Sequence, residues 1–263
     1  MRILVTGSSG FIGSNLVREL SKDFKIVTFD LKNDKREDVR NLNYLLKKSK
    51  GCDAIVHLAA LTSNLESLEK PHEYFTTNVI GTLNVLEVGR RLKIKKIINV
   101  SSSGVGARTP YNFSKLLAEE LCNFYSKKFK LKVISLRLFN VYGPGDKKSV
   151  IYKFIKGLKN NNPLIVYGDG KQVRDFIHVK DVIKVIKKLL EKDFSLGIYE
   201  VGSGKGTSVR KLIKILEKIT GKKPRIVYKK LPYEEIKYSV AKNTIVKNPI
   251  ELEEGVLELW NLR

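Results

Sequence analysis

The sequence predicts an α/β protein with a parallel, doubly wound sheet. Three observations favour this fold class: short apolar strands alternate with amphipathic helices, a glycine-rich turn follows the first strand, and polar residues gather where strands end. A sheet of this kind binds ligands beyond the carboxyl ends of its strands. With 263 residues, the chain can form one large unit or two closely joined domains.

The first strand, expected over 2–5, runs into a turn containing Gly7, Gly10 and Gly13. Glycine lets this turn approach a pyrophosphate and lets the following helix, 14–20, pack on the sheet. A second strand, 25–29, ends at Asp30, where a carboxylate binds the adenosine ribose and repels a 2′-phosphate. The unit predicts a Rossmann-like dinucleotide site that favours NAD.

The alternation continues with an amphipathic stretch over 41–50, a buried strand over 54–60, a helix over 71–92 and a strand over 96–100. This last strand ends at Ser101, Ser102 and Ser103. Because parallel strands share one carboxyl edge, we expect the serines, the glycine turn and Asp30 to converge.

Tyr111 and Lys115 begin the next predicted helix, just after Pro110. Positions i and i+4 share a helix face, and a nearby cation lowers the pKa of a tyrosine. The pair alone is also an ordinary helix start, so its interpretation as a proton-transfer pair depends on the adjacent nucleotide site.

Beyond Gly145 the pattern is looser and predicts a smaller α/β substrate lobe. We expect a NAD-binding domain over 1–145, with 173–195 packing back on it, and a substrate-binding lobe over 146–263. No linker rich in Pro, Gly or Ser separates them, so we expect the two to enclose one cleft.

Composition excludes several other classes. The chain is 42% hydrophobic and 29% charged, which is typical of globular proteins, and no apolar run is long enough to span a membrane. Met1 leads directly into a strand, so we expect no signal peptide, and the isolated Cys52 and Cys122 indicate reduced thiols in the cytoplasm. The three histidines lack acid or cysteine clusters, so we expect no metal site.

The formal net charge of +23 fits either a nucleic-acid surface or attraction to an anionic ligand. The lysines are spread along the chain, and arginines do not alternate with aromatic residues as base-stacking surfaces require. We therefore favour a solvated basic surface over specific nucleic-acid binding.

The motifs resemble those of the extended short-chain dehydrogenases/reductases, in the NAD-dependent nucleotide-sugar epimerase/dehydratase group. The matching segments are Thr6–Gly13, Asp30, His57–Ala60, Asn78 with Gly81–Thr82, Ser101–Ser103, Tyr111 with Lys115, Arg137–Pro144 and Val173–Asp181. The resemblance covers residues 1 to about 220.

The resemblance implies a role for each matching residue. Tyr111 would be the catalytic acid/base, and Lys115 would hold the nicotinamide ribose and lower the tyrosine pKa. Ser103, or alternatively Ser102, would bind the reacting sugar hydroxyl. The implied NAD-binding residues are Gly7, Gly10, Phe11, Ile12, Gly13, Asp30, Asp38, Leu58, Ala59, Ala60, Asn78, Ser101, Tyr111 and Lys115.

Asn140 and Arg174 match positions that contact the diphosphate of a nucleotide sugar. A planar guanidinium suits a diphosphate, although a surface ion pair with Asp175 is the alternative interpretation of Arg174.

Three segments depart from the family pattern. Seven residues separate Ser103 from Tyr111, fewer than relatives carry, so we expect a more open sugar pocket. The stretch from Asp30 to Asp38 is short for a third strand. Leu231–Glu235 lacks an arginine that often binds the distal phosphate, and lysine 229 or 230 would be a less directional substitute.

The implied activity is 4-epimerisation of the UDP-glucose/UDP-galactose type, through a transient 4-keto sugar. Gly104 and Val105 stand where a 4,6-dehydratase carries acidic residues, which disfavours dehydration. The alternatives are a UDP-uronic acid epimerase or decarboxylase, another nucleotide-sugar dehydratase, or a catalytically weak nucleotide-binding or RNA-associated regulatory protein. Apolar faces on the helices over 71–92 and 112–129 permit a homodimer.

Overall fold

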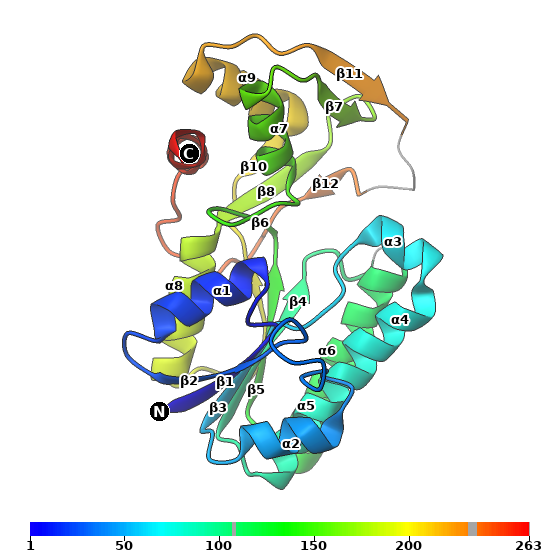
Figure 1. Ribbon diagram of the computed structural model, residues 1–263, viewed down its shortest axis with the longest axis vertical. Coiled ribbons are helices and arrows are strands. Elements are labelled where there is room, and N and C mark those ends of the chain that lie inside the picture. The colour runs from blue at the N-terminus through cyan, green and yellow to red at the C-terminus, as the bar shows by residue number, and fades with distance from the viewer. Residues whose placement is uncertain (107–108, 231–235, 263) are drawn as a thin grey trace. The chain divides into compact units, whose positions relative to one another are not determined.

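The computed structural model describes residues 1–106, 109–230 and 236–262 (Figure 1). The chain divides into two compact units, the first made of 1–137 and 183–199, the second of 138–182 and 200–263. The segment that returns to the first unit therefore starts later than the expected residue 173. The reason is that β8 (Val173–His178) pairs in parallel with β6 (Asn140–Tyr142) inside the second unit.

The first unit contains a six-stranded sheet in the order β2-β1-β3-β4-β5-β9. Its strands are β1 (Arg2–Thr6), β2 (Lys25–Phe29), β3 (Ala54–His57), β4 (Lys96–Ser102), β5 (Val133–Leu138) and β9 (Gly197–Val201). Parallel pairing of β1 with β2 and β3, and of β3 with β4, confirms the predicted fold class. The strand order reverses beside β1, which is where such sheets bind ligands.

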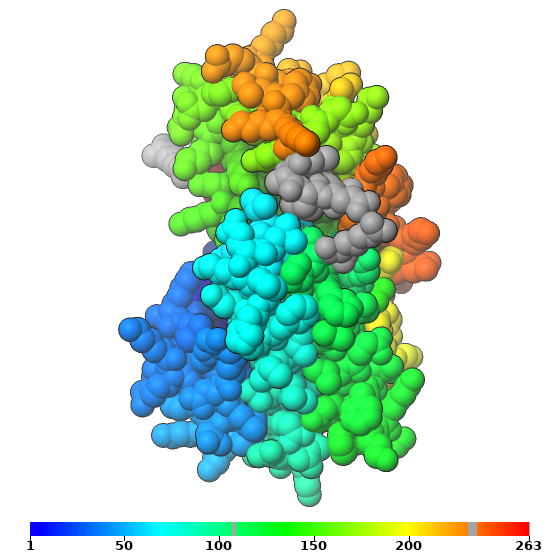
Figure 2. Space-filling model, turned by 90° about the vertical axis from the view of Figure 1, so that its right-hand side faces the viewer, coloured from blue at the N-terminus to red at the C-terminus, as the bar shows by residue number. Residues whose placement is uncertain are grey.

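Helices cover both faces of this sheet. Figure 1 shows α1 and α8 on one face and α2, α5 and α6 on the other. The helices are α1 (Phe11–Leu20), α2 (Leu42–Ser49), α3 (Asn64–Glu69), α4 (Pro71–Phe75), η1 (Thr76–Ile80), α5 (Gly81–Arg91), α6 (Pro110–Phe129) and α8 (Val179–Glu191). Figure 2 shows the surface that α3 to α6 form, in cyan and green.

Two local features differ from a regular pattern. The expected helix over 71–92 is interrupted by η1, a π-helical turn that contains Asn78, and such turns are frequent at functional sites. Between β2 and α2 the chain forms turns and no strand. The short stretch after Asp30 therefore leaves out a third strand, and β2 is the edge of the sheet.

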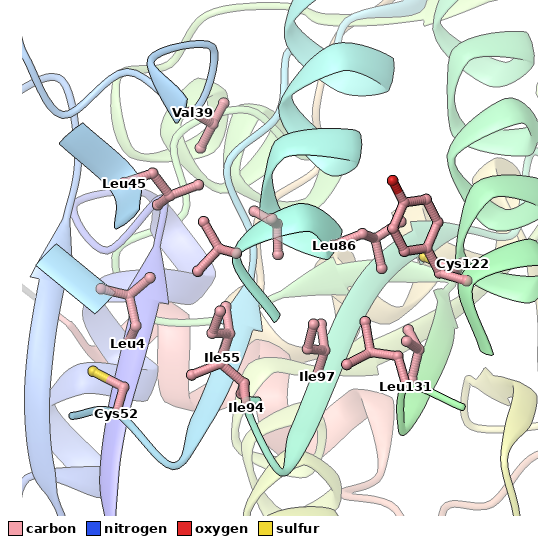
Figure 3. Packing of buried hydrophobic residues seen from close by; sticks show 14 of the residues in the cluster. Leu4, Val39, Leu45, Cys52, Ile55, Leu86, Ile94, Ile97, Cys122 and Leu131 are labelled. Carbon is pink, nitrogen blue, oxygen red and sulfur yellow. The ribbon is translucent and has the colours of Figure 1, made fainter. Parts of the chain in front are cut away.

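The core of the first unit lies between the sheet and the helices α2, α5 and α6 (Figure 3). Leu4, Ile55 and Ile97 project from three neighbouring strands and are fully buried, with Leu86 of α5 packed against them. Burying one such side chain contributes roughly 1.5–3 kcal/mol, which holds the carboxyl ends of these strands in place.

The second unit contains smaller sheets. Its elements are β6, β8, β7 (Leu164–Tyr167), β10 (Gly206–Ser208), β11 (Ile226–Lys229), β12 (Tyr238–Ser239), α7 (Val150–Lys159), α9 (Val209–Thr220) and α10 (Leu252–Asn261). Strand β8 lies between β10 and β12, and β11 pairs with β7. Tyr142, Phe154 and Leu212 belong to the separate core of this unit.

Candidate active site

The glycine turn forms a closely packed cradle at the carboxyl end of β1. Gly7 has φ +69°, and a Cβ there would lie 2.7 Å from the Ala59 nitrogen. A Cβ on Gly13 would overlap the Gly7 carbonyl, so neither position admits a side chain. Gly10 is the N-cap of α1, and Phe11 and Ile12 are its first helical residues, so the free N–H groups of this helix end face the turn.

The residues around the turn fit a dinucleotide. The hydroxyls of Ser8 and Ser101 are buried and, within the described part of the chain, have no hydrogen-bond partner. Buried polar atoms normally have partners, so these two point to a polar ligand. Together with the glycine cradle, they support NAD as the group this edge of the sheet holds.

Asp30 lies at the end of β2, as expected, and its position is fixed by the backbone. Its carboxylate accepts hydrogen bonds from the N–H groups of Ser9 and Lys32, both at 2.9 Å. Glu37 was not among the site residues predicted from the sequence. Its carboxylate is buried, accepts a hydrogen bond from the Asp30 N–H at 2.8 Å and forms an ion pair with Lys48 at 2.5 Å. Glu37 therefore anchors the segment that replaces the absent strand.

Asp38 makes a local ion pair. Its carboxylate accepts from the Arg40 N–H and guanidinium, which together hold the pKa of Asp38 below its ordinary value although partial burial raises it. The Asp38 side chain is 17% exposed and is engaged by Arg40. Its predicted contact with NAD stays a prediction.

The segment after β3 is held by two polar side chains. The Thr6 hydroxyl accepts the N–H groups of Leu58 and Ala59, both at 3.2 Å, and these residues with Ala60 lie beside the glycine turn. The Asn78 amide bonds both backbone groups of Leu61 and donates to the Ser114 hydroxyl at 2.9 Å. Asn78 thus connects this segment to α6, one turn from Tyr111, and holds the two parts of the candidate site together.

Tyr111 is in the first turn of α6, near Ser102 at the end of β4. The Ser102 hydroxyl accepts the Gly104 N–H at 3.1 Å and lies close enough to the Tyr111 phenol to act on its pKa. Strand β4 ends at Ser102, and Ser103 follows in the turn. Ser103, the first choice, and Ser102, the alternative, both stay candidates for the serine that binds the reacting sugar hydroxyl.

Lys115 follows Tyr111 by one turn of α6 and contacts the backbone of β4. Burial raises the pKa of Tyr111, although the Ser102 hydroxyl acts in the opposite direction. The Lys115 ammonium donates to the Val100 carbonyl at 2.5 Å, and burial lowers its own pKa to about 8. In the protein alone the Lys115 ammonium is directed at the backbone of β4, and its predicted lowering of the tyrosine pKa stays a prediction for the complex with NAD.

Several residues that the sequence did not identify support Tyr111. Asn64 of α3 accepts hydrogen bonds from the Thr109 hydroxyl at 2.9 Å and the Asn112 amide at 3.0 Å. Thr109 is the N-cap of α6, and the Tyr74 ring meets the Tyr111 ring edge to face with centroids 6.3 Å apart. These contacts brace the start of α6 where the preceding segment is short. A Thr or Asn before a helix is the only sequence signal they carry.

His57 is a structural residue. Its ring nitrogens bond the hydroxyls of Thr6 at 2.7 Å and Thr82 at 3.2 Å, and burial, followed by the Lys115 charge, lowers its pKa to about 3. Among the described residues no group of three or more His, Cys, Asp or Glu side chains could hold a metal ion. No helix within residues 1–106, 109–230 and 236–262 is long and apolar enough to cross a membrane.

In the second unit, Asn140 and Arg174 lie on the paired strands β6 and β8. Asn140 donates to the Asp175 carbonyl at 3.1 Å. The buried Asp175 carboxylate accepts from Ser203 and Gly204, which weighs against the alternative of a surface ion pair with Arg174. The prediction about Leu231–Glu235 lies outside the described residues, and Lys229 ends β11.

The geometry of the first unit supports one kind of chemistry. A partly buried phenol near serine hydroxyls can exchange a proton with a substrate hydroxyl, next to a site shaped for a dinucleotide. The arrangement suits reversible oxidation of an alcohol, with proton transfer by the protein.

Comparison with known proteins agrees with this arrangement. Residues 3–202 match the NAD dependent epimerase/dehydratase family. A UDP-glucuronate 4-epimerase of Thermodesulfobacterium geofontis is 31% identical over 86% of this chain and 82% of its own length.

Two solved structures are also similar. The UDP-glucose 4-epimerase of Thermotoga maritima with UDP-glucose has a TM-score of 0.89 and 28% identity, covering 99% of this chain and 97% of that one. The UDP-glucuronic acid 4-epimerase of Bacillus cereus with UDP-glucuronic acid and NAD has a TM-score of 0.89 and 29% identity, covering 99% and 98%.

Proposed function

This chain belongs to the NAD-dependent epimerase/dehydratase family, and on that premise we propose that it is a nucleotide-sugar 4-epimerase acting on a UDP-hexose. The observation that carries the proposal is the partly buried Tyr111 phenol, near the serines that end β4, at the same edge of the sheet as the glycine cradle. A hydroxyl on the sugar is the natural substrate for such groups, because a phenol and a serine hydroxyl both exchange protons with alcohols.

Each residue has a defined task in this reaction. Tyr111 takes the proton of the sugar 4-hydroxyl and later returns it, while Ser103, or alternatively Ser102, orients the same oxygen. NAD, when bound, would accept a hydride from carbon four and return it. The glycine turn and Asp30 would bind the dinucleotide, and Lys115 would hold its nicotinamide ribose. Asn140 and Arg174 bind the diphosphate of the substrate.

The residues after the serine argue against dehydration. Ser103 is followed by Gly104 and Val105, and Ser102 by Ser103 and Gly104, so with either serine no carboxylate stands there to eliminate water. A UDP-uronic acid substrate is the second candidate, because the same tyrosine and serine would serve its 4-hydroxyl.

The test is incubation of the purified protein with NAD and a panel of UDP-, dTDP- and GDP-sugars, with products identified by mass and chromatography. We expect interconversion of UDP-glucose and UDP-galactose, reduced about 10²- to 10⁴-fold in Tyr111→Phe. The matched control is Tyr125→Phe, on the same helix, whose hydroxyl bonds Glu87. NAD binding without conversion of any sugar would instead indicate the regulatory class, and conversion only of UDP-uronic acids would indicate the second candidate.

We also propose a homodimer, formed through the face of η1 and α6 that Figure 2 displays. Ile80 and Phe113 are 44% and 50% exposed there, and exposed apolar groups of this size often mark an interface. Light scattering after size exclusion should give a dimer mass, and Ile80→Glu with Phe113→Glu should give a monomer. A monomer mass for the unmodified protein would contradict the proposed dimer and would leave the proposed epimerase activity unaffected.

A further inference from the structure

A cavity of about 600 Å³ lies in the first unit at the opposite edge of the sheet from Tyr111. It is lined by residues at the amino ends of β1, β3, β4 and β5 and after the ends of α5, α6 and α8. The glycine turn and Tyr111 lie at the carboxyl ends of the strands, so this cavity is separate from the candidate active site. Its volume is in the range of small-ligand sites.

The lining is strongly cationic. Seven of its residues are Lys or Arg and three are Asp or Glu, an excess of four positive charges. The ends of helices carry roughly half a negative charge each, and three helices end here, so their dipoles neutralise less than half of the excess. Four of the 23 net positive charges of the chain therefore gather at this one place.

The lysines differ in how they are engaged. Lys96 donates to the carbonyls of Leu189 and Lys192 at 2.6 and 2.7 Å, which closes the end of α8. Lys95 pairs with Asp53 at 3.4 Å. The side chains of Lys93, Lys130 and Lys132, in contrast, have neither an ion pair nor a hydrogen bond in the part of the chain that the structure describes.

Two of these three lysines lie at helix ends. Lys130 is the C-cap of α6 and Lys93 directly follows the C-cap of α5, with φ +57° and +53°, a left-handed conformation in which many helices stop. The helix ends thereby bring both lysines to the lining of the cavity.

An aromatic wall accompanies the charges. Phe129 is 43% exposed, and its ring packs on Tyr125 with centroids 4.9 Å apart, which fixes its orientation. The Arg90 guanidinium lies 5.5 Å from the centre of the same ring. Aromatic rings and guanidinium planes stack on nucleobases, whereas lysines bind phosphates.

We propose that this cavity binds a nucleoside polyphosphate, with its phosphates held by Lys93, Lys130 and Lys132 and its base stacked beside Phe129. The recessed cavity favours a small ligand over an extended nucleic-acid strand. The site is independent of the proposed reaction, since none of its residues belongs to the catalytic or cofactor-binding set.

The test is calorimetric titration of the full chain with ATP, with NAD and UDP saturating so that the candidate active site is occupied. The cavity variant combines Lys93→Glu, Lys130→Glu and Lys132→Glu. Its control combines Lys214→Glu, Lys218→Glu and Lys223→Glu, three exposed lysines of the second unit, and changes the net charge equally. We expect ATP affinity to fall at least about tenfold in the cavity variant and less than about twofold in the control.

A second comparison tests the base. Phe129→Leu should weaken ATP by about fivefold and leave inorganic tripolyphosphate unchanged, because only ATP carries a ring to stack. Absence of ATP binding in the unmodified protein, or equal loss in both lysine triples, overturns the proposal. Binding of single-stranded RNA but not ATP also overturns it and assigns the surface to a polymer. Tyr111→Phe should retain ATP binding, so that the test of the cavity does not depend on whether the protein is an epimerase.

Discussion

Replacing Lys115 with Met should make the protein more stable and less active. Burial lowers the pKa of Lys115 from 10.5 to about 8, so the folded state holds this proton less tightly than the unfolded state. The difference of about 2.5 units corresponds to about 3 kcal/mol of destabilisation at pH 7, at roughly 1.4 kcal/mol per unit. Methionine fills a similar volume without a charge. Loss of the hydrogen bond to Val100 offsets about 1 kcal/mol, leaving a gain of about 2 kcal/mol.

The contribution of Lys115 to the free energy of unfolding depends on pH. The folded pKa lies below the unfolded one, so the unfavourable contribution of Lys115 is fully present below about pH 8 and disappears as the pH rises toward 10.5. The stability gain of Lys115→Met should therefore be largest at pH 7 and shrink between pH 8 and 10.

Urea unfolding of nucleotide-free protein at pH 7, 8, 9 and 9.5 measures this difference. Lys127→Met, an exposed lysine of the same helix, is the control and should differ from the unmodified protein by less than about 0.5 kcal/mol at every pH. A variant that is less stable at pH 7, or a gain that is independent of pH, would refute the argument that Lys115 is a buried and destabilising cation.

Three further predictions concern the candidate site. Ser103→Ala, at the first-choice serine, should lower kcat about 100-fold and Ser102→Ala only a few-fold; the reverse order in steady-state kinetics would assign the sugar hydroxyl to Ser102. Gly13→Ala should abolish NAD binding in a fluorescence titration, since its Cβ overlaps a backbone carbonyl, whereas Gly89→Ala, which meets only side chains, should lower the Tm and leave NAD affinity intact. Asp30→Asn should reduce the preference for NAD over NADP about tenfold, and an unchanged ratio of kcat/KM would show that the carboxylate does not select the cofactor.

Some local arrangements could be predicted from residues close together in the chain. The glycine turn, Asp30 and the helix that begins at Tyr111 are readable because backbone conformation, strand alternation and helix capping are short-range effects. The absence of a third strand was also indicated by the short stretch before Asp38, and the turns there agree with it.

Other features depend on contacts between distant segments. The π-helical turn at Asn78 accompanies bonds to Leu61 and Ser114, and the buried Glu37 is stabilised by Lys48, partners that no local pattern specifies. The same holds for Asn64, which braces the start of α6 from a different helix.

The sequence by itself determined the parallel α/β fold and the dinucleotide turn, and it selected Tyr111 as the candidate acid/base. These depend on residue type and spacing along one stretch of chain. Only the tertiary structure decided that Lys115 is directed at Val100 with its pKa lowered by burial. The reason is physical: hydrogen-bond partners and the loss of water around a charge are set by the packing of β4 against α6, which spacing does not encode.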